Sequence, residues 1–579
     1  MSLESGEAPF AAPARLLIDG AVEGPLLFSD TALSFWGGVG PETGLVIDQA
    51  HPLHGRCLEG TILAIPGGRG SCTGSAVLMQ LILNGKAPAG MVFSQAEEIL
   101  TLGVMVAEEM YGRSLPIAVI APEAFARLEG LDVLRIGAGS VSMPGADHRP
   151  DNAAMPAALP KLVLSDKDRH LLSDAVPQAT RTAMRIVVRM AELLGAKSLI
   201  DVAQVHVDGC IYTGPASLDF AEKLADWGGR VVLPTSLNAI SADQARWREQ
   251  GTDPVLSMAA SALADAYVRM GARPTFTCAP YQLDGAPDEG ENIAWAESNA
   301  VVYANSVLGA RTMKYPDFLD ICIALTGRAP QAGCHLTENR KARIAVEVKK
   351  PEGCDESFWP LLGYRIGALA PAVIPVVTGL EGTRPNLDDL KAFGAGFATT
   401  SAAPMFHIVG VTPEAPTFAA ATGGTELDAV TVTRCDLVED WHHFNPTTGD
   451  RIELVALGNP HFSFDECKAL AKHWAGRIKD PAVAVTITIG RATHSRIIAA
   501  GIAATLEAFG VTFVRDACWC TVMTPIVPPA ARTILTNSGK YAHYGPGLSG
   551  KAVRFGSLSD CAEAAVTGRA PSAPPAWLA

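Results

Sequence analysis

The segment PGGRGSCTGS, residues 66–75, places glycines, an arginine and a serine between a predicted strand and a predicted helix. Glycines let the backbone approach a ligand closely, and the N–H groups at a helix N-terminus attract anions. Arg69 could bind a carboxylate through charge-assisted hydrogen bonds, and Ser71 would face the same ligand. The G-x-x-x-x-G-K-[ST] spacing of a P-loop is absent. An ordinary glycine-rich turn is the alternative that the segment alone leaves open.

Two cysteines at predicted strand ends could bind a metal. Cys278 leaves an expected strand in TFTCAPY, and Cys518 follows the expected strand VTFVR in DACWC. Cys520 would point away from Cys518 if that strand continued, so we expect only Cys518 to face a site. The C-x-C spacing indicates neither a zinc ribbon nor a thioredoxin-like dithiol. A buried core thiol is the alternative for each cysteine.

Polar residues near these cysteines could contact a ligand. Glu297 and Asn299 stand at the expected start of a helix, where the acid could also act as a cap. His461 follows Asn-Pro in the loop GNPHFSFDE and could bind substrate or metal. A structural histidine is the alternative for His461.

The segment TNSGKYAHYGPGL, residues 536–548, combines a serine with a lysine. Ser538 and Lys540 could hold a carboxylate or a phosphate. The segment also begins a formal G-x-G-x-x-G at residues 545–550. KAVRFGSL follows it and reads as a strand rather than a helix, so we reject a dinucleotide site.

The elements that must position these residues change in character along the chain. Residues 15–142 contain short β-like runs such as LLIDG, TILAI and VLRIG, with one helical pattern, SAVLMQLILNG. From residue 162 helices alternate with strands, which predicts α/β layers with mostly parallel sheets and ligands at the carboxyl ends of strands. We expect a β-rich domain over 1–145, a proline-rich linker over 146–161 and a catalytic region of several α/β subdomains over 162–579.

Composition excludes several classes of function. The formal net charge of −14 disfavours nucleic-acid binding, and no apolar run reaches the length of a membrane span. The first residues lack the pattern of a signal peptide, so we expect a cytoplasmic protein. Its 12 dispersed cysteines then read as reduced thiols.

Taken together, these motifs resemble the aconitase X family. Residues 33–142, with GVGPETGLVID and IPGGRGSCTGS, resemble its small swivelling subunit. Residues 162–568 resemble its large subunit through TCAPY, AWAESNAVVYANSVLGAR, GNPHFS, DACWC and NSGKYAHY, and through VLPTSLNAIS, which contains Asn238. The two parts are fused here, as in the bacterial members that dehydrate cis-3-hydroxy-L-proline.

The resemblance implies an aconitase-like α/β core around an iron centre, with the N-terminal swivelling domain closing over it. Ser71 would be the base, supported by Arg69 and nearby N–H groups, because a serine acts as a base only where its alkoxide is stabilised. Iron would act as a Lewis acid on the leaving hydroxyl, and Lys540 would stabilise the enolate-like charge. Substrate contacts are expected from Ser538, His461, Asn238, Glu297 and Asn299.

The resemblance also implies iron ligands at Cys278 and Cys518, because thiolates hold iron–sulfur clusters. Archaeal members have a third cysteine in a Gly-Cys-Pro-His motif, where this chain has Asn459. Another thiol could substitute, and Cys354 is our choice. A two-iron–two-sulfur cluster or mononuclear iron would fit two or three thiols.

Three other functions compete with this hypothesis. The archaeal activity, dehydration of mevalonate 5-phosphate, needs a strong phosphate site. An iron-sensing RNA-binding protein is disfavoured by the acidic charge. A catalytically inactive scaffold is disfavoured by retention of Ser71, Arg69, Cys278, Cys518 and Lys540. The expected partner is a small hydroxy amino acid, and the expected state is a monomer or small homo-oligomer.

Overall fold

The computed structural model describes residues 9–69, 71–146, 159–446, 449–571 and 573–579, in two compact units. Most of the expected linker, 146–161, lies outside the described residues. The first unit comprises Met1–Ile200, Thr213–Arg230 and Tyr315–Ala332. The second comprises Asp201–Tyr212, Val231–Lys314 and Gly333–Ala579. None of the described helices combines the length and apolarity that crossing a membrane requires.

The first unit is built on an eight-stranded mixed sheet. Its strand order is β1-β8-β7-β3-β4-β5-β6-β2, with the run from β3 to β6 parallel and the other pairs antiparallel. The strands are β1 (Ala11–Pro13), β2 (Arg15–Ile18), β3 (Val22–Phe28), β4 (Ile62–Ala64), β5 (Gly90–Phe93), β6 (Ile117–Val119), β7 (Val133–Gly137) and β8 (Ser140–Ser142). The expected β-rich N-terminal part is confirmed. The further β-like run GLVID, residues 44–48, forms isolated bridges and no strand.

Helices of the first unit come from both sides of residue 162. They are α1 (Gly74–Asn84), α2 (Ile99–Tyr111), α3 (Pro122–Ala126), α4 (Asp166–Leu171), α5 (Gln178–Leu193), α6 (Pro215–Asp226) and α9 (Leu319–Thr326), with the strand pair β9 (Leu199–Asp201) and β13 (Arg328–Pro330). An ion pair of 2.8 Å between Arg185 Nε and Glu109 joins α5 to α2. Sequence patterns gave no sign of this packing across the expected boundary.

The second unit contains three parallel sheets, as the alternation of helices and strands predicted. Their orders are β11-β10-β12, β16-β15-β14-β17 and β20-β19-β18-β21-β22. The first two contain β10 (Val205–Val207), β11 (Thr235–Leu237), β12 (Ala294–Trp295), β14 (Ile344–Val348), β15 (Pro375–Thr378), β16 (His407–Ile408) and β17 (Ala429–Val432). The third contains β18 (Leu454–Leu457), β19 (Ala484–Ile489), β20 (Val511–Arg515), β21 (Thr533–Thr536) and β22 (Ala552–Phe555).

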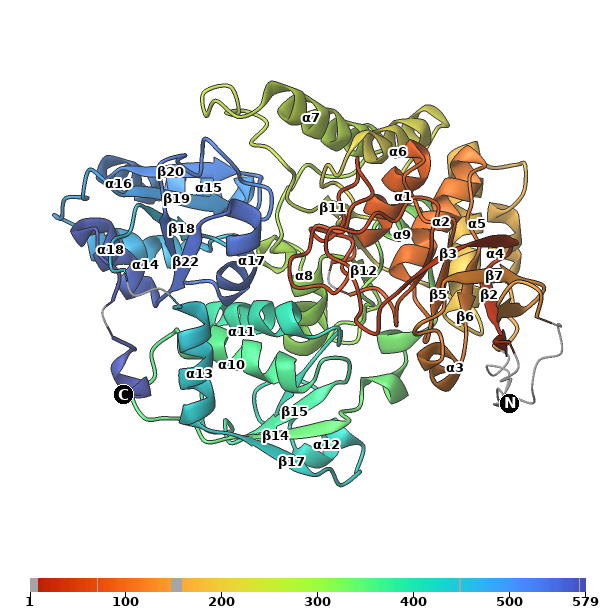
Figure 1. The fold of residues 1–579 in the computed structure, drawn as a ribbon. Helices are drawn as coiled ribbons and strands as arrows, with labels where there is room; N and C mark the ends of the chain where they lie inside the picture. Colours follow the sequence, from red (N-terminus) through yellow and green to blue (C-terminus); the bar gives the residue numbers. More distant parts are fainter. Residues whose placement is uncertain (1–8, 70, 147–158, 447–448, 572) are drawn as a thin grey trace. The chain divides into compact units, whose positions relative to one another are not determined.

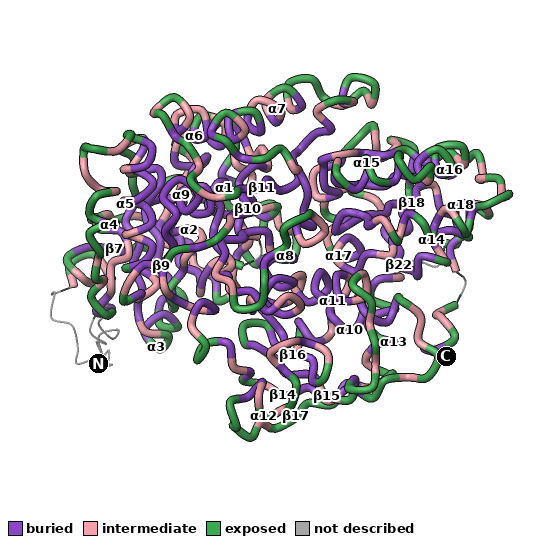
Figure 2. Tube along the Cα trace, turned by 180° about the vertical axis from the view of Figure 1, so that it is seen from behind, coloured by how far each residue is buried: buried purple, intermediate pink, exposed green. Residues whose placement is uncertain are grey.

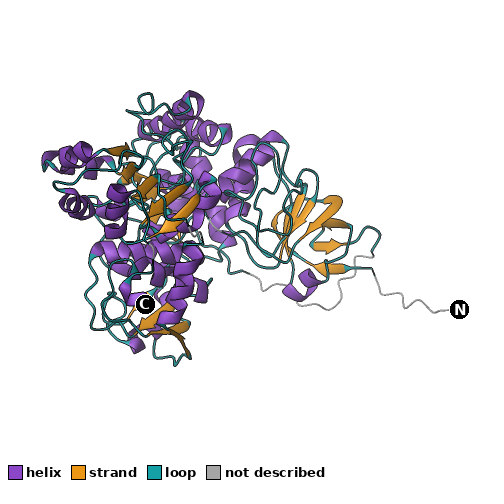
Figure 3. Cartoon of the chain, turned by 60° about the vertical axis from the view of Figure 1, so that its left-hand side comes forward, coloured by secondary structure: helices purple, strands orange, loops and turns teal. Residues whose placement is uncertain are grey.

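Helices lie beside these sheets (Figures 1 and 3). They are α7 (Pro254–Arg269), α8 (Ser298–Tyr303), α10 (Phe358–Leu369), α11 (Leu387–Thr400), α12 (Phe418–Thr422), α13 (Arg434–Phe444), α14 (Phe464–Trp474), α15 (Arg491–Ala499), α16 (Ile502–Phe509), α17 (Gly539–Ser549) and α18 (Leu558–Thr567). The pattern HSRIIAAGIAATLEAFG, residues 494–510, predicts one helix by itself. The structure has two, α15 and α16, because Gly501 adopts a left-handed φ of 72° between them.

The third sheet is apolar on both faces. Along β18, Val455 and Leu457 join one hydrophobic cluster with α14, α16 and α18, while Leu454 and Ala456 join another beside Trp519. Strands buried on both sides read as continuous apolar runs, as LVAL does. Figure 2 shows this buried interior. The loops that leave the carboxyl ends of these strands carry most of the chemistry described next.

Candidate functional site

Three cysteines meet in the second unit. Cys278 and Cys518 are buried against Ala239, and Cys520 packs against them. The Cys518 thiol lies within hydrogen-bonding reach of the thiols of both Cys278 and Cys520. The bond to Cys278 and burial raise the pKa of Cys518 to about 12, although Cys520 opposes the shift. The structure therefore brings together the two cysteines predicted as ligands and adds a third.

The Cys520 thiol lies beside the other two because strand β20 ends before it. Strand β20 ends at Arg515, and Asp516 takes a left-handed φ of 69°. Cys518 then opens a turn in which its carbonyl accepts hydrogen bonds from Thr521 N (2.9 Å) and Val522 N (3.2 Å). The expectation that only Cys518 would face the site is wrong, because it assumed a strand continuing through DACWC.

The structure places the other candidate thiol elsewhere. Cys354 is half-buried against the hydrophobic cluster around α10 and α13, and its thiol donates to Pro351 O at 3.0 Å. Cys354 is not among the thiols that meet at Cys518. Cys278 also differs from expectation, since it lies in an irregular segment and not at a strand end.

His461 holds two of the cysteine-bearing segments. Its backbone N–H donates to Cys278 Sγ at 3.3 Å. On the ring, Nε2 lies 2.9 Å from Ala517 O, and Nδ1 lies 3.2 Å from Thr277 Oγ1. Burial lowers the pKa of His461 to about 4, so the ring is neutral and Nε2 is the donor to Ala517. Both ring nitrogens are thus hydrogen-bonded to protein atoms. The partners belong to Thr277 and Ala517, the residues directly before Cys278 and Cys518.

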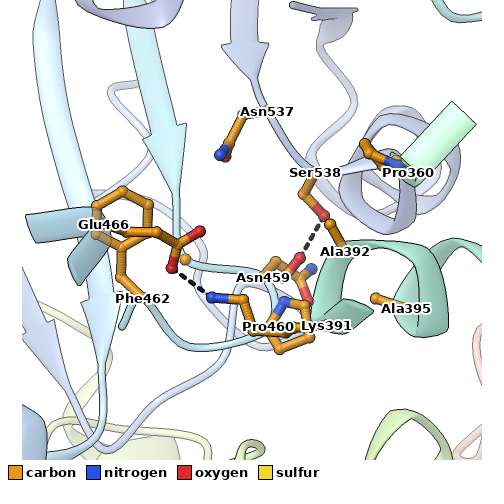
Figure 4. Close-up of a pocket in the computed structure, with 12 residues that line it drawn as sticks. Pro360, Lys391, Ala392, Ala395, Asn459, Pro460, Phe462, Glu466, Asn537 and Ser538 are labelled. Atoms are coloured by element: carbon orange, nitrogen blue, oxygen red, sulfur yellow. Dashed lines mark hydrogen bonds and ion pairs between the residues drawn. The ribbon is translucent and has the colours of Figure 1, made fainter. Parts of the chain in front are cut away.

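Asn459 lies beside the thiols. Its side-chain oxygen accepts from Cys518 Sγ at 3.9 Å, while its Nδ2 is buried without a hydrogen-bond partner. Its carbonyl accepts from Ser538 Oγ (Figure 4). Ser538 also caps α17, accepting from Tyr541 N at 3.1 Å. The hydroxyl of Ser538, a predicted substrate contact, therefore makes both of these hydrogen bonds with protein atoms.

An ion pair lies next to the cysteines. Lys540, in the first turn of α17, places Nζ 3.2 Å from Glu297 Oε1, and both side chains are largely buried. Burial opposes the charge of Lys540, but Glu297 and the nearby Cys520 and Cys518 outweigh burial and raise its pKa well above the usual value. The predicted lysine is thus a buried cation beside the thiols.

Glu297 and the two predicted asparagines are held by protein groups. Glu297 caps α8 by accepting from Ala300 N at 2.8 Å and from Asn299. Asn299 donates to Cys278 O at 3.0 Å. Asn238 donates to Asp208, and its oxygen accepts from Ala239 N at 2.7 Å. These residues shape the walls around the thiols.

Ser71 and Arg69 lie in the first unit. Ser71 Oγ is 3.1 Å from Thr73 Oγ1 and accepts from Thr73 N at 3.3 Å, just before α1 begins. Arg69 is half-exposed and forms a 2.9 Å ion pair with Asp48. A helix N-terminus and a donated N–H both favour negative charge on Ser71 Oγ.

The loop that carries Ser71 packs against a buried acid. Glu97 accepts hydrogen bonds from the N–H groups of Ile99, Leu100 and Thr101 at 2.8–3.2 Å. Burial raises its pKa to about 7, although these bonds oppose the shift. A Cβ at Gly68 would lie 2.7 Å from Glu97 Oε1. The fixed carboxylate therefore requires glycine at position 68.

We predict that Gly68→Ala destabilises the protein by about 1–3 kcal/mol, since overpacking beside a fixed group forces a backbone shift. Turnover should also fall, because the loop that carries Ser71 moves. Calorimetric unfolding and steady-state assays measure both effects. Gly382→Ala is the control, since a Cβ there meets nothing within 4 Å. Equal stability of the two variants would contradict the prediction.

The donor set suits an iron–sulfur group. Cys278, Cys518 and Cys520 are the soft ligands that hold such clusters, and the unpartnered Nδ2 of Asn459 could donate to a cluster sulfide. Among the described residues, no group of three or more His, Cys, Asp and Glu side chains is placed to hold a metal ion. Any such group would be held by the three thiols that meet at Cys518.

Family comparisons cover nearly the whole chain. Residues 11–143 match the aconitase X swivel domain, 161–338 the aconitase X first domain, 342–442 its second domain and 452–567 its third domain. The crystal structure of Thermococcus kodakaraensis aconitase X in its holo-form superposes with a TM-score of 0.63 and 29% identity, covering 70% of this chain and 100% of that chain.

Two relatives are similar along nearly their full length. Cis-3-hydroxy-L-proline dehydratase of Pseudomonas aeruginosa is 53% identical over 570 residues, 97% of this chain and 98% of that protein. The enzyme of the same name from Hypocrea jecorina is 53% identical over 562 residues, 95% of this chain and 94% of that protein. At this identity the reaction class is shared, and this chain is a dehydratase, a carbon–oxygen hydro-lyase. The chain belongs to the aconitase X family.

Proposed function

We propose that this protein dehydrates cis-3-hydroxy-L-proline to Δ1-pyrroline-2-carboxylate. The observation that carries the proposal is a cluster of three thiols beside a buried lysine, in a chain 53% identical to two dehydratases of that substrate. The proton removed from Cα and the hydroxide that leaves C3 together make one water. No electron is transferred, so the reaction needs no redox partner.

The proposed cofactor is an iron–sulfur cluster, most simply of two irons, held by Cys278, Cys518 and Cys520. When bound, it supplies a Lewis acid for the departing hydroxyl. The chain itself supplies the ligands and a dry, polar wall around them. Cys520 is proposed as the third ligand in place of Cys354, because Cys520 lies beside Cys518.

Ser71 is proposed as the base that removes the proton at Cα. Support comes from the Thr73 N–H donated to its Oγ at 3.3 Å and from the start of α1 three residues later, at Gly74. Both lower the free energy of an alkoxide. Arg69 is proposed to attract the substrate carboxylate, since its side chain is half-exposed and its partner Asp48 leaves the other guanidinium donors for a ligand.

Lys540 is proposed to stabilise the negative charge that develops when Cα loses its proton. Its buried ammonium is already balanced by Glu297 at 3.2 Å, so the charge is fixed in place before the reaction begins. Ser538, His461, Asn238 and Asn299 are proposed to orient the walls that contact the substrate. A cytoplasmic location and a monomer or small homo-oligomer remain predictions.

Anaerobic turnover of iron-reconstituted protein tests the proposed function. With cis-3-hydroxy-L-proline we expect iron-dependent formation of pyrroline-2-carboxylate. Trans-4-hydroxy-L-proline serves as the control substrate, because its hydroxyl is not β to the carboxylate and cannot leave by this route. Absence of product in protein with confirmed bound iron would reject the substrate assignment.

A further inference from the structure

A buried lysine lies between two acids and lines the same cavity as Asn459. Lys391, on α11, is only 4% exposed, and its Nζ lies 2.9 Å from Asp388 Oδ1. It also pairs with Glu466 on α14 (Figure 4). Burial disfavours the ammonium, but the two carboxylates outweigh this effect and raise the pKa of Lys391. The lysine is therefore a cation that ties two helices together.

These charges fix the first turn of α14. Ser463 is its N-cap, with Oγ accepting from Glu466 N at 3.0 Å and Glu466 accepting from Ser463 N at 2.8 Å. Ser463 Oγ also donates to Asp388 Oδ2 at 2.7 Å. Lys391 thus holds both of the acids that orient Ser463. We call Lys391, Asp388, Glu466 and Ser463 the Lys391 network.

The segment that ends at Ser463 is the one that contacts the thiols. Two residues earlier, the His461 N–H donates to Cys278 Sγ at 3.3 Å. Two residues before that, Asn459 Oδ1 accepts from Cys518 Sγ at 3.9 Å. A displacement of the segment would alter both contacts at once.

The segment is also held by packing, since His461 and Phe462 are fully buried. A cavity of about 30 Å³ lies alongside it, room for one or two water molecules, and is lined by Lys391, Glu466, Asn459, Pro460 and Ser538 among others (Figure 4). The ionic tie to α11 therefore adds a directional restraint at the end of the segment to the restraint that packing supplies.

We propose that Lys391 is a positioning residue that holds residues 458–463 against the thiols of Cys278 and Cys518. The proposal rests on the proposed function, which assigns these thiols to the cofactor. In this proposal Lys391 acts indirectly, because its ion pairs are with Asp388 and Glu466 and not with the thiols.

Thiol labelling of the apo-protein tests the positioning directly. We compare Lys391→Met with Arg365→Met, which breaks a partly buried ion pair to Asp440 (2.7 Å) between α10 and α13. A charge-neutral triple variant, Lys391→Met with Asp388→Asn and Glu466→Gln, removes the unpaired buried acids and keeps a glutamine at the cap. Labelling rates of Cys278, Cys518 and Cys520 are measured by mass spectrometry well below the unfolding temperature.

We expect labelling of these thiols to rise at least tenfold in Lys391→Met and at least threefold in the triple variant. Arg365→Met should stay within twofold of the unsubstituted protein. Reconstituted iron should fall by half or more in the two Lys391 variants. A folded triple variant with unchanged labelling and iron would overturn the proposal, as would equal effects in Arg365→Met. Failure of the unsubstituted protein to turn over substrate would reject the proposed function and leave the labelling comparison intact.

Discussion

Replacing Ser71 by alanine should lower turnover about 1,000-fold or more while leaving folding and iron content unchanged. A positioned general base contributes about 10²–10⁴-fold to a rate, and alanine cannot accept the Cα proton. Within the part of the chain that the structure describes, the Ser71 hydroxyl hydrogen-bonds with the neighbouring Thr73 alone, so its loss removes no long-range hydrogen bond there. Turnover is measured anaerobically at saturating substrate, with iron per chain determined on the same samples.

Ser75→Ala is the matched control for this experiment. Ser75 Oγ is buried and donates to Cys72 O at 3.1 Å and to Asp317 O at 3.2 Å. Its removal should cost about 1 kcal/mol of stability but retain most of the turnover. Near-normal activity in Ser71→Ala would eliminate Ser71 as the base, whatever the behaviour of Ser75→Ala.

The sequence predicted the architecture where hydrophobic patterns were long and continuous. The run AVTITI became β19, and the alternation after residue 162 became parallel sheets. The patterns failed where packing between distant segments decides the structure. Nothing local in α5 indicates that Arg185 pairs with Glu109, 76 residues earlier in the chain. Likewise, apart from the glycine at position 501, no local sequence feature marks the break between α15 and α16.

For the site, motif spacing identified residues but not their contacts. Cys278, Cys518, Lys540 and Glu297 do lie in one region of the second unit. Cys520 was set aside because side chains alternate along a strand, and that rule does not apply after the left-handed Asp516. The sequence did carry a signal that the strand ends before Cys518. The β-branched pattern stops at Arg515, and a proline-rich stretch follows. Lys391 was missed because a buried ion pair between helices leaves no local pattern.

The identity of the third iron ligand gives the other large expected effect. We predict that Cys520→Ala, like Cys278→Ala and Cys518→Ala, loses at least half of the bound iron and most of the turnover. A cluster that loses one of three thiolates is exposed to solvent and oxidation. Cys354→Ala should keep iron and turnover near normal, because its thiol donates to Pro351 O away from the other three.

Iron and sulfide per chain, together with the visible absorption spectrum, measure the outcome after anaerobic reconstitution. Cys354 is a sound control because it is a partly buried thiol of the same unit, so its replacement makes a comparable cavity. Loss of iron in Cys354→Ala with retention in Cys520→Ala would contradict the assignment and favour Cys354, the substitute thiol chosen for the cysteine that Asn459 replaces. Loss of iron in Cys520→Ala with retention of iron in Cys354→Ala would show that the turn after Asp516 completes the ligand set. The separate loop that carries Cys354 would then have no part in it.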